Sequence, residues 1–258
     1  MSELKYNYET FQNEYYDPTS FISGAPRVGE CATDFEAETL DRRKVRLSDF
    51  AGQRIILEMG SITCPMFGGN IEGMNGLAAA HPDVAFLVLY TREAHPGRKR
   101  ASHSAMDQKR QAARDVSERV SGARTILIDD VDGTAHRQWG EFPNSSWIID
   151  EGGVVIYRMD WSQATVLQRV LEAPDLEAAI AAEHERNHVD MAGAKALHTT
   201  RYMRHNSGVN AILHVVRELF GMRRRHTDTD AAYAAQALPP PRPERQGPCW
   251  SGITSSQE

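Results

Sequence analysis

Apolar and polar positions change their period several times along this chain, and the changes predict an order of strands and helices. Short apolar runs bounded by glycine or proline predict buried strands at 54–59 and 84–90. Between them, apolar residues recur at helical spacing over 66–80, which predicts a helix that His81-Pro82 ends. A strand, helix and strand in so short a stretch form a crossover unit, so we expect the two strands to be parallel.

The same patterns predict further elements on either side of this unit. Strands are predicted at 32–38, 44–47, 125–128, 147–149 and 154–158, and helices at 104–121 and 163–185. Ala173-Pro174 should break the second helix, with Asp175 as the N-cap of its last part. The last two strands form a hairpin because Gly152-Gly153 favours a tight turn. This order predicts an α/β fold with a thioredoxin-like central mixed sheet flanked by helices.

Changes in residue composition along the sequence divide the chain into four parts. Residues 1–25 are polar and aromatic and predict an N-terminal arm, followed by the thioredoxin-like domain at 26–186. Residues 187–232 predict a helical C-terminal extension, with its best amphipathic pattern at 209–222. Residues 233–258 form a Pro- and Ser-rich tail with too few apolar residues to offset its ordering entropy, so we expect it to be disordered.

Composition and charge narrow the class of protein. With 41% hydrophobic and 25% charged residues, the chain resembles an ordinary soluble globular protein. A net charge of -6 gives no general reason to bind nucleic acid, and no apolar run is long enough to cross a membrane. The first residues lack the apolar core of a signal peptide, so we expect a cytoplasmic protein. Whether it forms a homodimer is left open.

Cys64 is the most informative of the three cysteines. It lies where strand 54–59 passes into helix 66–80, so free N–H groups and the helix dipole would favour a thiolate. Pro65 suits the first helical position, and the Ser61 and Thr63 hydroxyls could donate to the sulfur. The alternative is a small buried hydrophobe, which is the common fate of a free cysteine. The strand-to-helix position favours the reactive interpretation.

The chemistry of Cys64 would be that of a single thiol. Phe67 stands where a thioredoxin carries its second cysteine, so no local dithiol can form. The cycle then needs an external thiol reductant or a distant resolving thiol, for which Cys31 is the candidate and Cys249 the other cysteine. Three cysteines do not suggest a structural disulfide framework. We expect no tightly bound cofactor.

The C-terminal histidines offer a weak alternative chemistry. His184 and His188 are four residues apart, a spacing that two metal ligands on a helix can use. No Glu in the metalloprotease pattern and no nearby cysteine accompanies them. We therefore interpret them as polar residues on a solvated helix and predict no metal site.

Two segments of the chain resemble a known family. Gly60-Ser61-Ile62-Thr63-Cys64-Pro65-Met66-Phe67 resembles the active-site segment of the iodothyronine deiodinases, a thioredoxin-like branch with selenocysteine where Cys64 stands. Tyr90-Thr91-Arg92-Glu93-Ala94-His95-Pro96 resembles the family's Glu-Ala-His-Pro segment. His103 and the stretch from Pro143 to Asp150 extend the likeness, which spans about residues 26–175 and leaves out the arm and the tail.

The resemblance implies roles for the matching residues. Cys64 would be the nucleophilic or halogen-accepting sulfur, with Glu93, His95 and His103 handling protons and substrate, and Pro143 would start a strand near the site. The predicted strands agree with these roles. Strands 54–59 and 84–90 are expected to be parallel neighbours, and ligands bind at the carboxyl ends of such strands in open α/β sheets. Alternatively, His95 could shape a loop before Pro96 and His103 could cap the next helix.

Some positions depart from the family. Cysteine is a poorer nucleophile than selenocysteine because more of it is protonated. Ile62 stands where many members have a further cysteine, and Asn144-Ser145-Ser146 lacks the arginine expected after Pro143. We therefore do not expect thyroid hormone to be the natural substrate.

These observations predict a thiol-dependent oxidoreductase. Cys64 would reduce a small-molecule substrate, namely a peroxide, a disulfide or a halogenated aromatic, and a thiol reductant or reductase would restore it. One alternative is a dehalogenating or tailoring enzyme that forms a covalent Cys64 adduct. Another is a non-catalytic thioredoxin-fold binding or regulatory protein that acts through its C-terminal helices.

Overall fold

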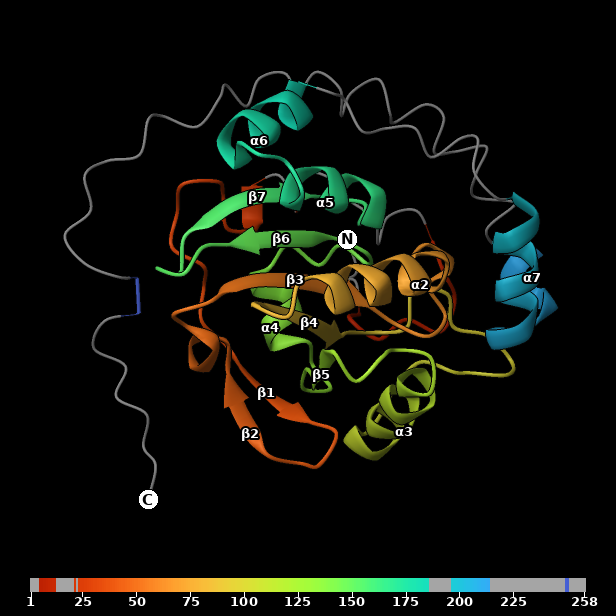
Figure 1. The fold of residues 1–258 in the computed structure, drawn as a ribbon. Helices are drawn as coiled ribbons and strands as arrows, with labels where there is room; N and C mark the ends of the chain where they lie inside the picture. Colours follow the sequence, from red (N-terminus) through yellow and green to blue (C-terminus); the bar gives the residue numbers. More distant parts are fainter. Residues whose placement is uncertain (1–4, 13–20, 22, 186–195, 214–248, 251–258) are drawn as a thin grey trace.

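A seven-stranded sheet with helices on its faces forms the centre of the protein (Figure 1). The computed structural model describes residues 5–12, 21, 23–185, 196–213 and 249–250. The strand order is β2-β1-β5-β4-β3-β6-β7, with parallel and antiparallel neighbours. The predicted α/β fold with a mixed sheet is therefore confirmed.

The elements follow one another in the predicted order. The strands are β1 (Glu36–Thr39), β2 (Lys44–Arg46), β3 (Arg54–Gly60), β4 (Val84–Tyr90), β5 (Arg124–Ile128), β6 (Ser146–Ile149) and β7 (Val155–Met159). The helices are the 3-10 turn η2 (Leu47–Phe50), α2 (Pro65–Ala80), α3 (Met106–Ser117), α4 (Thr134–Gln138), α5 (Ala164–Leu171), α6 (Leu176–Glu185) and α7 (Ala196–Asn206).

The thioredoxin-like unit consists of β3, α2, β4, β6, β7 and α5. β3 and β4 pair in parallel and β6 pairs with β3 in the antiparallel sense, which gives the order β4-β3-β6-β7. β5 extends the sheet in parallel beside β4. The register pairs Gly60 with Tyr90, so β3 and β4 end level with each other. The loops that follow these two strands therefore meet at one edge of the sheet.

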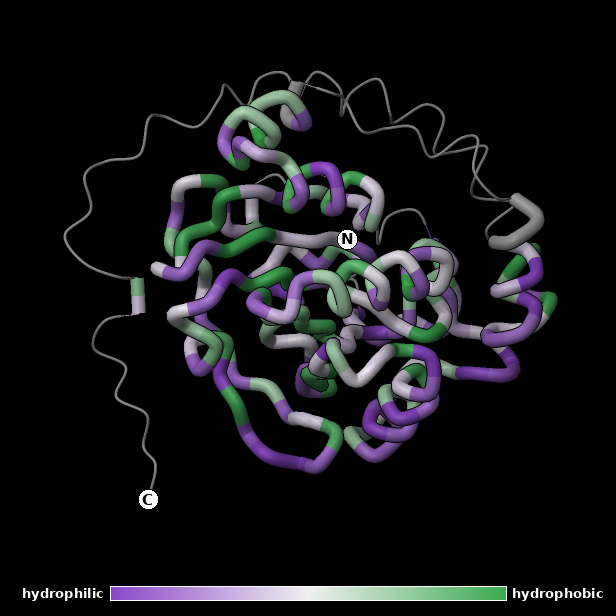
Figure 2. The backbone as a smooth tube through the Cα atoms, in the orientation of Figure 1, coloured by the Kyte–Doolittle hydropathy of each residue, from purple (hydrophilic) through white to green (hydrophobic). Residues whose placement is uncertain are grey.

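Both faces of the sheet are buried. Along β3, Ile55, Leu57 and Met59 face one core, whereas Ile56 faces the other, as the alternation of a strand requires. Helices α2, α3 and α5 cover the Ile56 face, and α4 with the N-terminal segment covers the opposite face. Figure 2 shows the hydrophobic stretches gathered in the central strands and a largely hydrophilic α3.

The predicted ends of several elements hold. His81 is the C-cap of α2, and the Asp175 carboxylate accepts a hydrogen bond from the Ala178 N–H at 3.0 Å as the cap of α6. α4 was not predicted because its five residues are too few to show a period. The amphipathic pattern at 209–222 is helical at 209–213, and its remainder lies outside the described residues. α7 lies within 187–232, where a helical extension was predicted, although no separate helix was delimited at 196–206.

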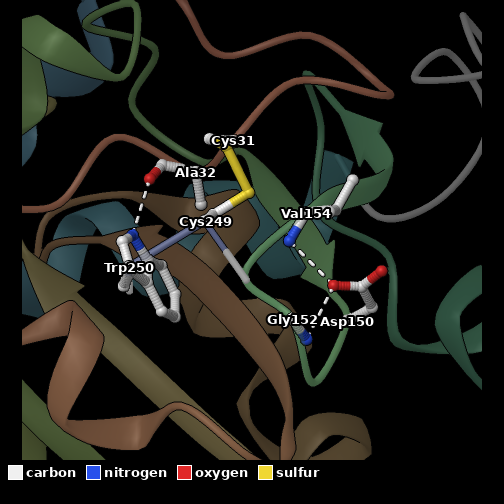
Figure 3. Close-up of a disulfide and its surroundings, with 7 residues drawn as sticks. All are labelled: Cys31, Ala32, Asp150, Gly152, Val154, Cys249 and Trp250. Carbon is white, nitrogen blue, oxygen red and sulfur yellow. Dashed lines mark hydrogen bonds between the residues drawn. A yellow bond between two sulfur atoms is a disulfide. The ribbon is translucent and has the colours of Figure 1, made fainter. Parts of the chain in front are cut away.

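A disulfide joins Cys31 to Cys249, with 5.4 Å between the Cα atoms (Figure 3). The Cys249 N–H donates to the Gly152 carbonyl at 2.9 Å, and the Trp250 indole N–H donates to the Ala32 carbonyl at 3.0 Å. The expectation that the cysteines form no structural disulfide was wrong. The two residues are 218 positions apart, a pairing that no local pattern can show.

Candidate active site

Cys64 occupies the predicted junction of strand and helix. It is the N-cap of α2, and Pro65 opens the helix. The backbone N–H groups of Met66 and Phe67 lie near enough to its sulfur to lower the pKa of the thiol, although the side chain makes no capping hydrogen bond. The first turn of α2 therefore supplies donors to the thiol, as its position predicted.

Burial nevertheless keeps the thiol protonated in this structure. Cys64 is 1% exposed and lies in an apolar cluster with Ile62 and Phe67. Burial raises the pKa of the Cys64 thiol to about 12, and the nearby backbone N–H groups of Phe67 and Met66 oppose this only in part. The negative charges of Glu58 and Glu93 raise the pKa further. The helix N-terminus was thus expected to yield a thiolate, and desolvation reverses that result here.

Glu93 is the centre of a buried hydrogen-bond network beside Cys64. Its Oε1 accepts from the Tyr90 hydroxyl at 2.6 Å and lies 3.2 Å from His103 Nε2. Its Oε2 accepts from the Thr63 hydroxyl at 2.5 Å and the Thr63 N–H at 3.2 Å. Burial alone would raise the Glu93 pKa, but His103 and these hydrogen bonds lower it below its ordinary value. Glu93 is therefore ionised, and His103 pairs with it instead of capping α3, whose N-cap is Ala105.

The Ser61 and Thr63 hydroxyls join the two loops of the site. Thr63 Oγ1 donates its proton to Glu93 and accepts from the His95 N–H at 3.1 Å. Ser61 Oγ accepts from the Ala94 N–H at 3.1 Å. The proton of Thr63 is therefore directed to Glu93 and not to the thiol. The loop that carries Cys64 is held against the loop that carries Glu93 and His95.

His95 is neutral and packed by the N-terminal segment. The Phe11 ring meets the imidazole edge to face, with 4.7 Å between centroids. The Tyr8 hydroxyl donates to the Ala94 carbonyl at 2.7 Å. Burial lowers the pKa of His95 to about 3, so the ring carries no charge at neutral pH. It can accept a proton only where water or a charged substrate offsets that burial.

The structure adds residues that the sequence did not single out. Tyr90 was quoted only as the start of the segment that resembles the family, and its hydrogen bond to Glu93 gives it a place in the site. Tyr8 and Phe11 belong to the N-terminal arm, which was expected to lie outside the resemblance. Their packing depends on contacts between distant segments, so neither a motif nor a period indicates it.

Phe67 and Pro143 lie at this end of the sheet as well. Phe67 is fully buried, and its ring fills the space that a side chain at position 60 would need. Pro143 is buried in the turn before β6. That turn lies beside the end of β3, because the Met59 N–H donates to the Ser145 carbonyl at 2.8 Å.

Cys31, the candidate resolving thiol, is not near Cys64. It is bonded to Cys249 and bridges to Val154, at the end of the sheet where β3 begins. Cys64 follows the other end of β3, so the two sites are separated by roughly the 20 Å length of a seven-residue strand. In this structure Cys31 is a disulfide partner, which corrects its assignment as a resolving thiol.

The described part of the chain contains no group of three side chains suited to hold a metal ion. Of the two histidines at metal-ligand spacing, His188 and the side chain of His184 lie outside the described residues. Within the same residues, no helix combines the length and the apolar content that a membrane span needs.

Comparison with known proteins identifies relatives of this fold and site. The iodothyronine deiodinase family model matches residues 2–162. Thyroxine 5-deiodinase of Gallus gallus is 30% identical over 141 residues, which cover 50% of this chain and 54% of that protein. The corresponding protein of Aquarana catesbeiana is 28% identical over 154 residues, or 55% and 56% of the two chains. The chain thus spans about half the length of the curated relatives it matches.

Solved structures with similar folds are more distant. A thioredoxin-like protein from Bacteroides caccae has a TM-score of 0.44 and 12% identity, covering 58% of this chain and 50% of that one. A thioredoxin-like protein from Aeropyrum pernix has a TM-score of 0.43 and 16% identity, covering 54% and 88%. At these TM-scores the likenesses add nothing to the sheet topology described above.

The family match corrects one boundary. It begins at residue 2, so the N-terminal arm, which was expected to lie outside the resemblance, belongs to it. This agrees with the packing of Tyr8 and Phe11 against the loop of His95. The match ends at residue 162, before α5, α6 and α7. Since it covers more than half of the 258 residues, the protein belongs to the iodothyronine deiodinase family.

Proposed function

We propose that this protein is a thiol-dependent oxidoreductase that reduces a small molecule at Cys64 with electrons from an external thiol. One observation carries the proposal. Cys64 is the free thiol of the chain, whereas the other two cysteines form a disulfide at the opposite end of the sheet. The chain therefore has no second free thiol that could form a disulfide with oxidised Cys64, so an external thiol must reduce it.

The cycle can be written with balanced steps for a peroxide. Cys64 attacks one peroxide oxygen, the O–O bond breaks, and the thiol becomes a sulfenic acid while water or an alcohol leaves. A first external thiol condenses with the sulfenic acid to a mixed disulfide and releases water. A second external thiol attacks that disulfide and restores Cys64. A small disulfide as substrate would enter directly at the mixed disulfide.

The Glu93 network would manage the protons of these steps. Deprotonation of Cys64 requires a base, and protonation of the leaving group requires an acid. The pair of Glu93 and His103 lies next to the Cys64 loop, and Tyr90 and Thr63 connect to the same carboxylate. A proton can be held between Glu93 and His103 and passed along these hydroxyls.

Family membership favours a second candidate, reductive dehalogenation. In that reaction the carbon–iodine bond of an aromatic breaks, the iodine passes to the Cys64 sulfur, and a proton takes its place on carbon. External thiols then displace iodide and restore Cys64, leaving a disulfide of the reductant. The Glu93 and His103 pair would supply the proton. Because the stretch after Pro143 lacks the expected arginine, we propose a small iodinated phenol and not thyroid hormone.

The decisive experiment measures turnover with three substrates. Purified protein with dithiothreitol is incubated with hydrogen peroxide, a small disulfide or an iodophenol, and compared with Cys64→Ser. We expect consumption of at least one substrate, lost in Cys64→Ser and retained in the matched control Cys31→Ser/Cys249→Ser. Iodide release would select dehalogenation, whereas peroxide or disulfide consumption alone would reject it. No Cys64-dependent turnover with any substrate would reject the enzyme and favour the binding protein.

The cytoplasmic location stays a prediction. Disulfides persist mainly in oxidising compartments, so the Cys31–Cys249 bond is a reason to test the location directly.

A further inference from the structure

Cys64 is covered by a segment that follows the family match. The match ends at residue 162, whereas α7 and the residues after it, 196–213, pack against α2. Figure 1 shows α7 beside α2, on the side of the molecule opposite residues 249–250. A segment outside the family match therefore packs on the helix that begins directly after Cys64. We call residues 196–213 the cover.

Tyr202 is the residue of the cover that closes the thiol site. Its ring lies on Gly68, and even a methyl group at position 68 would overlap it. The Gly68 N–H donates to the Cys64 carbonyl at 2.9 Å, so Tyr202 sits one helical turn from the thiol. Tyr202 is 6% exposed, and the guanidinium of Arg119 stacks on its ring at 5.2 Å. Burial raises the pKa of Tyr202, and a charge on Cys64, were the thiol ionised, would raise it further.

A second set of contacts attaches the cover to the loop after His95. The Ser207 carbonyl accepts from the Lys99 N–H at 3.4 Å and lies where a side chain at position 97 would stand. The Lys99 ammonium donates to the His205 carbonyl at 3.2 Å, and Asn210 Oδ1 accepts from the Arg98 N–H at 3.4 Å. The cover thus bridges the helix that follows Cys64 and the loop that follows His95.

The contacts that hold the cover to the loop after His95 are weak enough to break. The three hydrogen bonds to Lys99 and Arg98 are 3.2–3.4 Å long, at or beyond the long end of the normal range, and both of these residues are exposed. Apolar side chains on the far part of the cover, Val209 and Leu213, are 57% and 65% exposed and add little burial. The cover also has buried side chains, Tyr202, Met203, Ser207 and Ala211, but far fewer than the central sheet, and segments with fewer buried contacts open at a smaller free-energy cost.

We propose that residues 196–213 are a movable cover that opens to admit substrate and shuts over Cys64, with Tyr202 as the closing residue. The inference rests on the proposed function in that Cys64 is the reacting group. With the cover shut, a substrate cannot reach a sulfur that is 1% exposed. Opening also brings water to the thiol and removes the burial that holds its pKa at about 12. One motion would therefore control both access to the thiol and its fraction of thiolate.

The test measures alkylation of Cys64 by iodoacetamide in the full chain with its disulfide intact. Cys64 is the free thiol, so the rate of label uptake reports that sulfur alone. Tyr202→Ala removes the closing ring, and Gly68→Ala displaces it from the other side of the contact. We expect both to accelerate alkylation at pH 8 by at least about tenfold, because exposure and thiolate fraction govern thiol reactivity. Leu213→Ala, on the exposed side of the cover, is the control and should react at the wild-type rate.

A measurement on the wild type guards against variants that merely unfold. The amides of 200–207 should exchange with deuterium at least about 100-fold faster than those of β3 and β4, and Cys64 should alkylate at the rate of this local opening. The proposal of a movable cover is overturned if Tyr202→Ala and Gly68→Ala alkylate at the wild-type rate. It is also overturned if the wild type alkylates only at the rate of global unfolding. Neither measurement needs turnover. If the cover opens as expected but no substrate is reduced, the proposed function is rejected and the proposal of a movable cover still stands.

Discussion

The Glu93 carboxylate lies 3.2 Å from His103 Nε2, and both side chains are almost fully shielded from water. In a site of low dielectric such a pair acts as a unit, since moving a proton from one partner to the other changes the charge of both. Thr63 and Tyr90 direct their hydroxyls to the same carboxylate. The pair is thus fixed in position before any substrate arrives.

Replacing Glu93 by glutamine should impair turnover far more than folding. Glu93→Gln keeps the shape of the side chain but removes the charge that orients His103 and can hold a proton. We expect kcat to fall by roughly 100-fold to 10,000-fold, the usual contribution of a positioned acid or base. The pH profile of kcat/KM should lose one limb as well.

The matched control for this change is Glu141→Gln. Glu141 pairs with Arg92 at 3.2 Å but is 30% exposed and lies outside the Cys64 network. It should retain activity close to that of the wild type. Equal losses in the two variants would show that Glu93 has no special role in proton transfer.

The pH dependence of stability should reveal the buried His95. Its pKa in the folded protein is about 3, below the ordinary 6.5, so between these values the unfolded chain binds a proton that the folded chain does not. Stability therefore rises with pH through this window and falls as pH drops, by up to about 1.4 kcal/mol per pH unit from this residue. His95→Gln should remove that part of the slope in unfolding titrations.

Direct titration of the ring checks the same point. The NMR resonances of the His95 imidazole should stay those of a neutral ring as the pH falls from 7 to 4. A midpoint near 6.5 would show that the ring is hydrated in solution and that burial does not lower its pKa.

The elements that carry the candidate site could be predicted from short stretches of the sequence. β3, α2 and β4 were predictable because each has a clear period and a terminating residue, and they place Cys64 at the start of α2. The parallel pairing of β3 with β4 then brings Glu93 and His95 to the same edge. The order and pairing of these elements were therefore enough to predict that Cys64, Glu93 and His95 lie at the same edge of the sheet.

The protonation state of Cys64 could not be predicted in the same way. The helix N-terminus is a local feature and favours a thiolate, but burial is produced largely by segments far away in the sequence, among them Tyr202 and the apolar residues Val116 and Ile126. Desolvation is the larger effect here. No pattern near Cys64 reports how much chain will pack over it.

Removing the disulfide should lower stability and leave the thiol chemistry intact. A bond between residues 218 positions apart restricts the unfolded chain strongly, and the chain-entropy model gives about 5 kcal/mol as an upper value. We expect Cys31→Ser/Cys249→Ser to lose about 2–4 kcal/mol in denaturant unfolding. Because the bond lies at the opposite end of β3 from Cys64, Cys64-dependent turnover below the melting temperature should be unchanged. A loss of turnover without a loss of stability would instead place Cys31 or Cys249 in the catalytic cycle.

The ion pair of Glu58 with Arg124 should be the most sensitive charged contact in the sheet. Both side chains are within 1% of full burial, and Ser162 and Asn70 donate further hydrogen bonds to Glu58 at 2.9 and 2.8 Å. Arg124→Met leaves the carboxylate buried without its cation, which should cost about 3–5 kcal/mol of unfolding free energy. Replacing both residues by apolar ones should recover much of that loss, since the pair itself adds little net stability.

The exposed pair of Arg43 with Asp41 provides the control for that experiment. Its side chains are 72% and 62% exposed, so Arg43→Met should cost no more than about 1 kcal/mol. Chemical denaturation of the three variants separates the two cases. An equal, small loss in Arg124→Met would mean that Glu58 becomes hydrated or protonated at little cost. The core behind Cys64 would then be more open to water than its packing indicates, and the burial that raises the Cys64 pKa would be correspondingly weaker.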